Sequence, residues 1–174
     1  MKPEYLKLLA DKDWRLNNLY WITDKEGKPT RFRMTPEQRE YFEGIHTRNI
    51  ILKARQLGFT TLICIYFLDC ALFRKNVRCG IIAHEEDAAK AIFRDKVKFA
   101  YENLPGALRG IMPLKRDAAE ELLFAHNNSS IRVATSMRPG TIHRLHISEF
   151  GKICARYPQK AAEVMTGSIP AVPK

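Results

Sequence analysis

The segment that most constrains the fold is Ile50-Ile-Leu-Lys-Ala-Arg-Gln-Leu-Gly-Phe-Thr-Thr61. It has the pattern of an apolar strand, a short loop and a helix, with Gly58 at the turn and Thr60 two residues later. This is the layout of a nucleotide phosphate-binding loop, except that Phe59 replaces the usual lysine after the second glycine. A lysine stands instead at Lys53, at the position of the pattern's first glycine. For an isolated match of this kind, an ordinary strand-to-helix turn is the alternative.

The residues of this loop suit the binding of a triphosphate. The N-terminus of a helix offers unpaired N–H donors and the positive end of the helix dipole, and Gly58 allows a positive φ and a close approach of the backbone. We expect the Thr60 hydroxyl to bind Mg²⁺, and Lys53 and Arg55 to supply the cation from the other side of the loop. The expected backbone cradle comprises Gln56, Leu57, Gly58, Phe59, Thr60 and Thr61.

A second signal lies in the segment His143-Arg-Leu-His-Ile-Ser-Glu-Phe150. Its alternating bulky residues predict a strand with Glu149 at the C-terminal tip. Ligands of open parallel α/β sheets bind at the carboxyl ends of the strands, so we expect Glu149 on the same sheet edge as the loop at Gly58. A carboxylate there can orient and activate a water for attack on a γ-phosphate. The alternative is a surface acid that merely ends a strand.

Together these two segments resemble the ATPase domain of phage terminase large subunits, the motors that package DNA into viral capsids. The resemblance rests on Lys53-Ala-Arg-Gln-Leu-Gly-Phe-Thr60 and on Leu145-His-Ile-Ser-Glu149, and it covers most of the chain. The chain departs from the family at Phe59, where a lysine is usual, and at Ser148, where an aspartate is usual. The resemblance implies a RecA-like P-loop NTPase fold, with ATP and Mg²⁺ as cofactors.

The resemblance also implies roles for single residues. Glu149 is expected to be the catalytic base and, together with Thr60, a ligand of Mg²⁺. Arg55 is expected to act in cis as an arginine finger that offsets charge at the γ-phosphate, and Arg138 to act in trans on the ATP of a neighbouring subunit. Gln38, upstream of the loop, is expected to contact adenine. The alternatives are a loop arginine paired with a local carboxylate for Arg138 and an exposed helical glutamine for Gln38.

The order of strand and helix patterns indicates an α/β fold with a mostly parallel sheet flanked by helices, and with N-terminal and inserted β-hairpins. We expect a single, incomplete ATPase domain over residues 1–174, with an N-terminal adenine-side segment at 1–47 and the P-loop core at 48–174. The expected elements are helices at 1–18, 35–46, 61–73, 85–103 and 158–165, strands from residue 50, at 77–84 and at 143–150, and β-hairpins at 19–33 and 121–135.

Composition narrows the class of protein and of partner. A chain of 174 residues fits one domain with a real core, and its longest apolar run, 61–73, is too short to cross a bilayer. The net charge of +10 favours a polyanion such as DNA, although a solubility charge or a surface that contacts other subunits is the alternative. Four cysteines without C-x-x-C spacing indicate reduced thiols of a cytosolic protein. His143 and His146 point to opposite faces of a strand, which excludes a shared metal ion.

We therefore expect an ATP-hydrolysing motor domain of a viral terminase large subunit, which powers packaging of double-stranded DNA into the procapsid. The family implies a portal protein, a small terminase subunit and a homo-oligomeric ring as partners, no membrane, and the cytoplasm of the bacterial host of a phage or prophage as the location. The chain stops before the family's coupling motif and nuclease domain, so we expect a fragment without DNA cleavage.

Two alternatives remain open from the sequence. One is another RecA-like DNA translocase or helicase, which would differ in the motifs that follow residue 174. The other is a basic nucleic-acid-binding or assembly module with a vestigial nucleotide site, which Phe59 and Ser148 favour.

Overall fold

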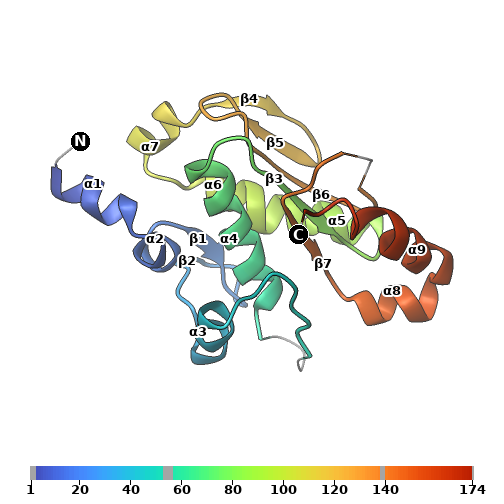
Figure 1. Ribbon diagram of the computed structural model, residues 1–174. Helices are drawn as coiled ribbons and strands as arrows, with labels where there is room; N and C mark the ends of the chain where they lie inside the picture. Colours follow the sequence, from blue (N-terminus) through green and yellow to red (C-terminus); the bar gives the residue numbers. More distant parts are fainter. Residues whose placement is uncertain (1–2, 53–56, 138–139, 174) are drawn as a thin grey trace.

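The structure is a computed structural model that describes residues 3–52, 57–137 and 140–173 (Figure 1). The chain has an α/β fold built on a five-stranded mixed sheet with the strand order β4-β5-β6-β3-β7, and a separate antiparallel pair, β1-β2. The strands are β1 (Trp21–Thr23), β2 (Pro29–Arg31), β3 (Arg78–Ile82), β4 (Leu114–Asp117), β5 (Glu121–Phe124), β6 (Ser130–Ala134) and β7 (Arg144–Ile147). The helices are α1 (Pro3–Ala10), α2 (Lys12–Asn18), α3 (Pro36–Glu43), α4 (Phe59–Phe73), α5 (Glu86–Ile92), α6 (Phe99–Glu102), α7 (Gly106–Ile111), α8 (Phe150–Arg156) and α9 (Pro158–Glu163), with π-helical segments η1 (Phe93–Lys98) and η2 (Val164–Ser168).

Parallel pairing is confined to three neighbouring strands. β3 lies between β6 and β7 and is parallel to both, with Ile82 opposite Ala134 on one side and Ile147 on the other. β4, β5 and β6 are joined by antiparallel pairings. The expectation of a mostly parallel sheet is therefore wrong, because residues 114–134 return through short turns instead of through crossover helices.

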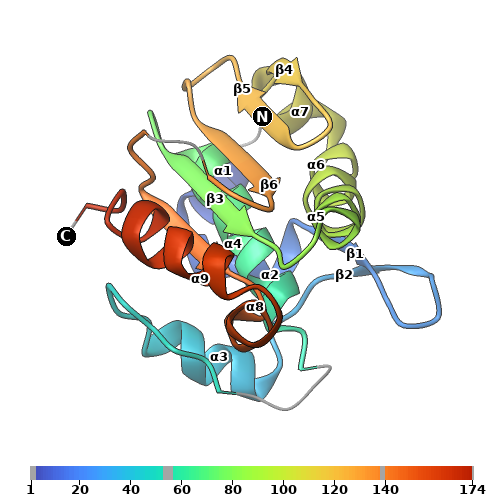
Figure 2. The same cartoon turned by 90° about the vertical axis from the view of Figure 1, so that its right-hand side faces the viewer.

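Helices cover both faces of this sheet (Figures 1 and 2). Successive residues of a strand point to opposite faces, and β3 shows the two environments directly. Ile81 belongs to the large core cluster that includes the side chains of α4, whereas Ile82 packs with Ile153 of α8 and Val164 of η2. The larger core thus lies between the sheet, α4 and the N-terminal helices, and a smaller one lies under α8 and α9.

α4 is the centre of the larger core, and it confirms the predicted buried helix behind the loop. Its sequence is apolar on every side, which is typical of a helix enclosed by other elements. Burial extends over Phe59 and over residues 62–72. It contacts α2 on one side and β3, β6 and η1 on the others. A helix enclosed in this way holds the residues at its N-terminus in a fixed position relative to the sheet.

A buried polar cluster joins the N-terminal helices to α4. Asp69 of α4 accepts two hydrogen bonds from the Arg15 guanidinium, each 2.8 Å long, and a third of 2.8 Å from the Tyr20 hydroxyl. Arg15 also donates to the Leu9 carbonyl at 2.6 Å. Burial, and secondarily the Asp69 carboxylate, raise the pKa of Tyr20 well above its ordinary value, so its hydroxyl remains a donor. Each charged group of the cluster is therefore paired, as burial requires.

The strand predicted from residue 50 is not present. Ile50 and Leu52 are 98% and 100% exposed and belong to no strand, and within the described residues β7 pairs only with β3. An apolar run becomes a strand only when a neighbouring strand satisfies its backbone groups, and residues 50–52 pair with no strand of the sheet. The predicted strand is therefore wrong for the described residues 50–52.

Other predicted elements differ at their boundaries. Both hairpins are confirmed, as β1-β2 and β5-β6. The predicted helix at 1–18 is divided because the Asp11 carboxylate accepts N–H bonds from Asp13 and Trp14 and thereby starts a new helix. The predicted helix at 85–103 contains the π-helical η1, and β4 and α8 were not expected. Within the described ranges, no helix has the length and hydropathy of a membrane span.

Candidate functional site

α4 starts at a glycine with a left-handed backbone. Gly58 is the N-cap and takes the left-handed conformation, with φ 68° and ψ 13°. No side chain of the described residues caps this helix. The first N–H groups of a helix have no partner within the helix and lie at the positive end of the helix dipole, an arrangement that anions can bind.

Gln38 fixes the loop from the side of α3. Its side-chain oxygen accepts from the Thr35 N–H at 3.2 Å, and its Nε2 donates to the Leu57 carbonyl at 2.9 Å. A Cβ at Gly58 would lie 2.7 Å from that same Nε2, so only glycine fits the turn beside this side chain. Gln38 is buried and its amide bonds to protein groups, and an adenine contact for it stays a prediction.

Phe59, the residue in the place of the usual lysine, is part of the hydrophobic core. Phe59 is buried, and its ring meets the Tyr41 ring edge-on with the centroids 5.6 Å apart. A cation reaches the same turn from another element, because Lys96 of η1 donates from Nζ to the Thr61 hydroxyl at 3.0 Å. No local pattern pointed to Lys96, since it lies 35 residues from Thr61. A π-helical segment inside a longer helix is often found at functional sites.

Glu149 lies just beyond the carboxyl end of β7. The strand ends at Ile147, and the buried Ser148 still donates its N–H to the Ile82 carbonyl at 2.8 Å. Glu149 then takes the left-handed conformation, with φ 56° and ψ 45°, and α8 begins after it. Its side chain is 57% exposed and lies near His84 and Lys152. A left-handed conformation is uncommon for a glutamate, and strained residues of this kind cluster at functional sites.

The two parts of the candidate site lie on one side of the molecule. In Figures 1 and 2 the N-terminal end of α4 and the start of α8 both lie toward the lower edge. The expectation that Glu149 follows the carboxyl end of a parallel strand is thereby confirmed. Lys53, Arg55, Gln56 and Arg138 fall outside the described residues, and their expected roles stay predictions.

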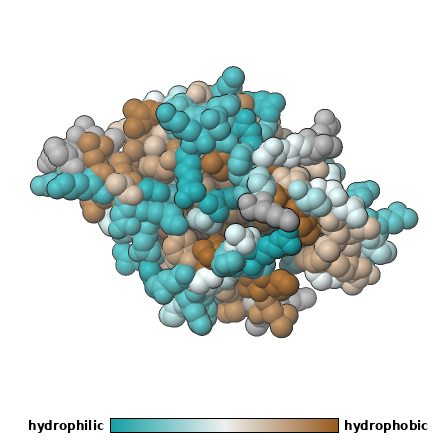
Figure 3. Space-filling view, in the orientation of Figure 1, coloured by the Kyte–Doolittle hydropathy of each residue, from teal (hydrophilic) through white to brown (hydrophobic). Residues whose placement is uncertain are grey.

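An open hollow of about 530 Å³ adjoins the start of α4 on the side of α3. Its lining combines the apolar side chains of Tyr41, Leu57 and Phe59 with two acidic residues of α3, Glu37 and Glu40, and the exposed Ile50 and Leu52 also line it. Figure 3 shows hydrophobic surface at the lower edge of the molecule, near the segment that precedes α4. The aromatic and aliphatic part of this lining suits a flat ring such as a base.

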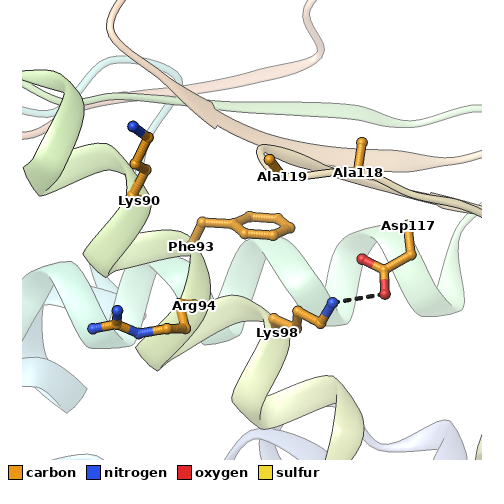
Figure 4. Close-up of a pocket in the computed structure, with 7 residues that line it drawn as sticks. All are labelled: Lys90, Phe93, Arg94, Lys98, Asp117, Ala118 and Ala119. Carbon is orange, nitrogen blue, oxygen red and sulfur yellow. Dashed lines mark hydrogen bonds and ion pairs between the residues drawn. The ribbon is translucent and has the colours of Figure 1, made fainter.

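A second hollow, of about 350 Å³, lies between the α5–η1 helix and the β4-β5 turn (Figure 4). Lys90, Arg94 and Lys98 surround it, but each of these cations pairs with a carboxylate at 2.6–2.7 Å. In Figure 4 the Lys98 ammonium points to Asp117, and the Phe93 ring lies beneath the turn. This hollow is therefore close to electrically neutral, and it does not resemble an anion site.

No protein-family model and no curated protein sequence matches the chain. Within the described residues, no group of three or more histidine, cysteine, aspartate or glutamate side chains is placed to hold a metal ion. Any magnesium at this site would consequently depend on Thr60, Glu149 and the oxygens of the ligand itself, as is usual for Mg²⁺ with a nucleotide.

Proposed function

We propose that this chain is the ATP-binding and ATP-hydrolysing motor domain of a viral terminase large subunit, with a RecA-like P-loop fold, which powers the packaging of double-stranded DNA. The observation that carries the proposal is the placement of two features on one side of the molecule. One is α4, which starts at a left-handed glycine, and the other is Glu149 beyond the carboxyl end of β7. An open N-terminus for phosphates and a carboxylate for water are the two parts that phosphoryl transfer to water requires.

The residues at the start of α4 fit a triphosphate. The backbone of the first turn supplies N–H donors, the Thr60 hydroxyl stands on that turn, and Gly58 leaves room for close approach. Lys96 adds a cation from η1 beside Thr61, in keeping with the loss of the usual lysine. Mg²⁺ held by Thr60 and Glu149 would offset the charge of the phosphate oxygens.

Other parts of the chain would contact the adenine base, the phosphates and the partners. The hollow lined by Tyr41, Leu57 and Phe59 would take the adenine ring by apolar contact. Lys53 and Arg55 would bind the phosphates and offset their charge. Arg138 would do so for the ATP of a neighbouring subunit in a ring. The net charge of +10 supports DNA as the polyanion that the motor moves, with the portal protein and the small subunit as further partners.

The test separates binding from turnover. Glu149→Gln keeps the shape of the side chain and removes the carboxylate, so we expect Mg-ATP binding close to that of the parent and turnover reduced by at least about 100-fold. Glu163→Gln, an exposed change at the end of α9, serves as the matched control and should leave turnover unchanged. Equal turnover by Glu149→Gln and the parent would exclude Glu149 as the base.

One observation favours a second candidate, a basic nucleic-acid-binding module with a vestigial nucleotide site. Phe59 stands at the position of the usual lysine, and its side chain is buried in the core, where its ring packs on that of Tyr41. On this hypothesis DNA binding falls steeply with salt, because bound phosphates release counterions, and Mg-ATP leaves the melting temperature unchanged. Thermal melts with and without Mg-ATP, beside DNA titrations at two salt concentrations, distinguish the two functions. Another RecA-like translocase or helicase would show ATP binding as well.

A further inference from the structure

Four titratable side chains meet beyond the ends of β3 and β7. The register pairs Ile82 with Ile147, so His84 and Glu149 each stand two residues past the last pair of their strands. The Nδ1 atom of His84 lies 3.6 Å from Oε2 of Glu149. Its Nε2 atom lies 2.9 Å from Oε1 of Glu85 and 2.6 Å from Nζ of Lys152. The His84 side chain is only 10% exposed, so the cluster has a nearly buried ring at its centre.

The backbone beneath this ring is fixed by a further cation. Lys160 of α9 donates from Nζ to the carbonyls of Ala83 and His84, at 3.0 and 3.1 Å. Burial lowers the pKa of Lys160, which indicates that its ammonium group is partly withdrawn from water. Lys152 reaches the same place from α8 and lies 3.7 Å from Oε2 of Glu149. The position of His84 is thus determined from two helices as well as from β3.

The partners of Nε2 decide which group of His84 faces Glu149. A lysine ammonium can only donate, so the contact with Lys152 requires a bare Nε2 and places the proton of a neutral ring on Nδ1. That N–H lies on the side of the ring that faces Glu149, whose Oε2 is 3.6 Å from Nδ1, somewhat longer than a direct hydrogen bond. A hydrogen bond to Glu85 requires instead a proton on Nε2. In a neutral ring Nδ1 then carries a lone pair that faces the Glu149 carboxylate. The Lys152 side chain is 35% exposed and that of Glu85 52%, so the contact with Lys152 is the less solvated of the two, which favours the first arrangement.

Glu149 needs such a support because little else holds it. Its side chain is 57% exposed, and among the described residues its ion-pair contacts are those with His84 and Lys152, both to Oε2. A carboxylate that orients a water must be held within a fraction of an ångström of its working position. Contacts confined to Oε2 leave Oε1 available for the water.

We propose that His84 is a positioning residue for Glu149, held by Lys152 in the tautomer that directs Nδ1–H to the carboxylate. The effect on turnover rests on the proposed ATPase function, whereas the tautomer is a property of the protein alone. His84 does not touch the reacting atoms, and it acts through the orientation of Glu149.

The kinetic test uses the different shapes of two amides. The amide nitrogen of asparagine can occupy the place of Nδ1, and that of glutamine the place of Nε2. We expect His84→Ala and His84→Gln to lower kcat for Mg-ATP by about 10- to 100-fold with KM unchanged, and His84→Asn to restore most of it. Thermal melts show which variants are folded. Parent-like kcat in His84→Ala, or restoration by glutamine equal to that by asparagine, would overturn the proposal.

The second test does not depend on turnover. The ¹⁵N shifts of the His84 ring, assigned by their loss in His84→Asn, report which nitrogen carries the proton in the neutral ring. We expect the proton on Nδ1 in the parent and a loss of this preference in Lys152→Met. A proton on Nε2 in the parent contradicts the inference. Absence of Mg-ATP turnover in the parent would count against the ATPase function, and the ring shifts would still decide the tautomer.

Discussion

Lys96 is a cation from a distant part of the chain at the first turn of α4. Its ammonium donates to Thr61 at 3.0 Å, and no ion pair joins it to a carboxylate of the described residues. Lys98, two residues later, pairs with Asp117 at 2.7 Å. Among the described residues the charge of Lys98 is therefore paired with a carboxylate and that of Lys96 is not, so Lys96 is the better placed of the two to bind an anion.

We predict that Lys96→Met weakens the binding of Mg-ATP by about tenfold or more, because it removes one charge-assisted contact to phosphate. Lys98→Met is the matched control and should leave the affinity near that of the parent. Isothermal titration of each variant measures the effect. Equal losses in the two variants would point to a general effect of charge, and parent-like affinity in Lys96→Met would remove this lysine from the site.

Asp69 tests the buried polar cluster. Its carboxylate accepts from Arg15 and Tyr20, and the Arg15 side chain is 9% exposed. Asp69→Ala leaves a buried guanidinium unpaired, so we predict a loss of roughly 3–5 kcal/mol in the free energy of unfolding. Asp95→Ala breaks a solvent-exposed pair with Arg94 and should cost less than about 1 kcal/mol. Urea denaturation compares them, and similar losses in both would show that the cluster adds no stability.

At the scale of elements, the join between α3 and α4 is set by one glycine. Gly58 has a positive φ, and a methyl group there would collide with Gln38. We predict that Gly58→Ala lowers the free energy of unfolding by about 1–3 kcal/mol, from left-handed strain and the lost bond to Leu57.

Gly44 provides the control for this change. It ends α3 with φ −90°, and a Cβ there would make only ordinary contacts, the nearest at 3.5 Å. Gly44→Ala should therefore change the free energy of unfolding by no more than about 0.5 kcal/mol. Urea denaturation of both variants gives the comparison. Stability of Gly58→Ala equal to that of Gly44→Ala would show that the turn tolerates a side chain.

The elements that were predicted correctly are those whose sequence pattern lies entirely within the element and its turns. The helix at 61–73 is a continuous apolar run, the strand before Glu149 has alternating bulky residues, and the hairpin has turn residues around 126–129; all three are confirmed. The strand from residue 50 failed because an apolar run does not determine whether a neighbour pairs with it. β4 and η1 depend on tertiary packing, for which a local window carries no signal.

The candidate site divides in the same way. Gly58, Thr60 and Glu149 could be predicted as candidates because each stands at a fixed place in a local pattern, a loop or the end of a strand. Lys96 and His84 were missed because they reach the site from η1 and from the end of β3. Only the fold brings these segments together. In the sequence alone, nothing distinguishes Lys96 or His84 from other lysines and histidines.

For the molecule as a whole, burial divides the four cysteines into two kinds. Cys64, Cys70 and Cys79 lie in the larger core, and Cys154 is exposed on α8. Burial raises the pKa of the Cys64 thiol to about 12 and that of Cys79 well above its ordinary value, so both stay protonated at neutral pH. A thiolate is the reactive form of cysteine.

We predict that an aromatic disulfide reagent modifies one thiol per chain quickly at neutral pH and all four after unfolding, with absorbance as the measure. Cys154→Ser is the control and should abolish the fast reaction. Rapid modification of more than one thiol in the folded parent would show that the larger core opens easily.

A calorimetric titration of Mg-ATP and Mg-ADP into the parent chain shows whether the first turn of α4 binds a magnesium nucleotide. Lys53→Ala and Arg55→Ala accompany the parent, and circular dichroism establishes that each protein is folded. We predict saturable binding to one site in the parent and its loss in the two variants. No heat of binding in a folded parent would contradict nucleotide binding at this turn and leave the basic nucleic-acid-binding module as the better function.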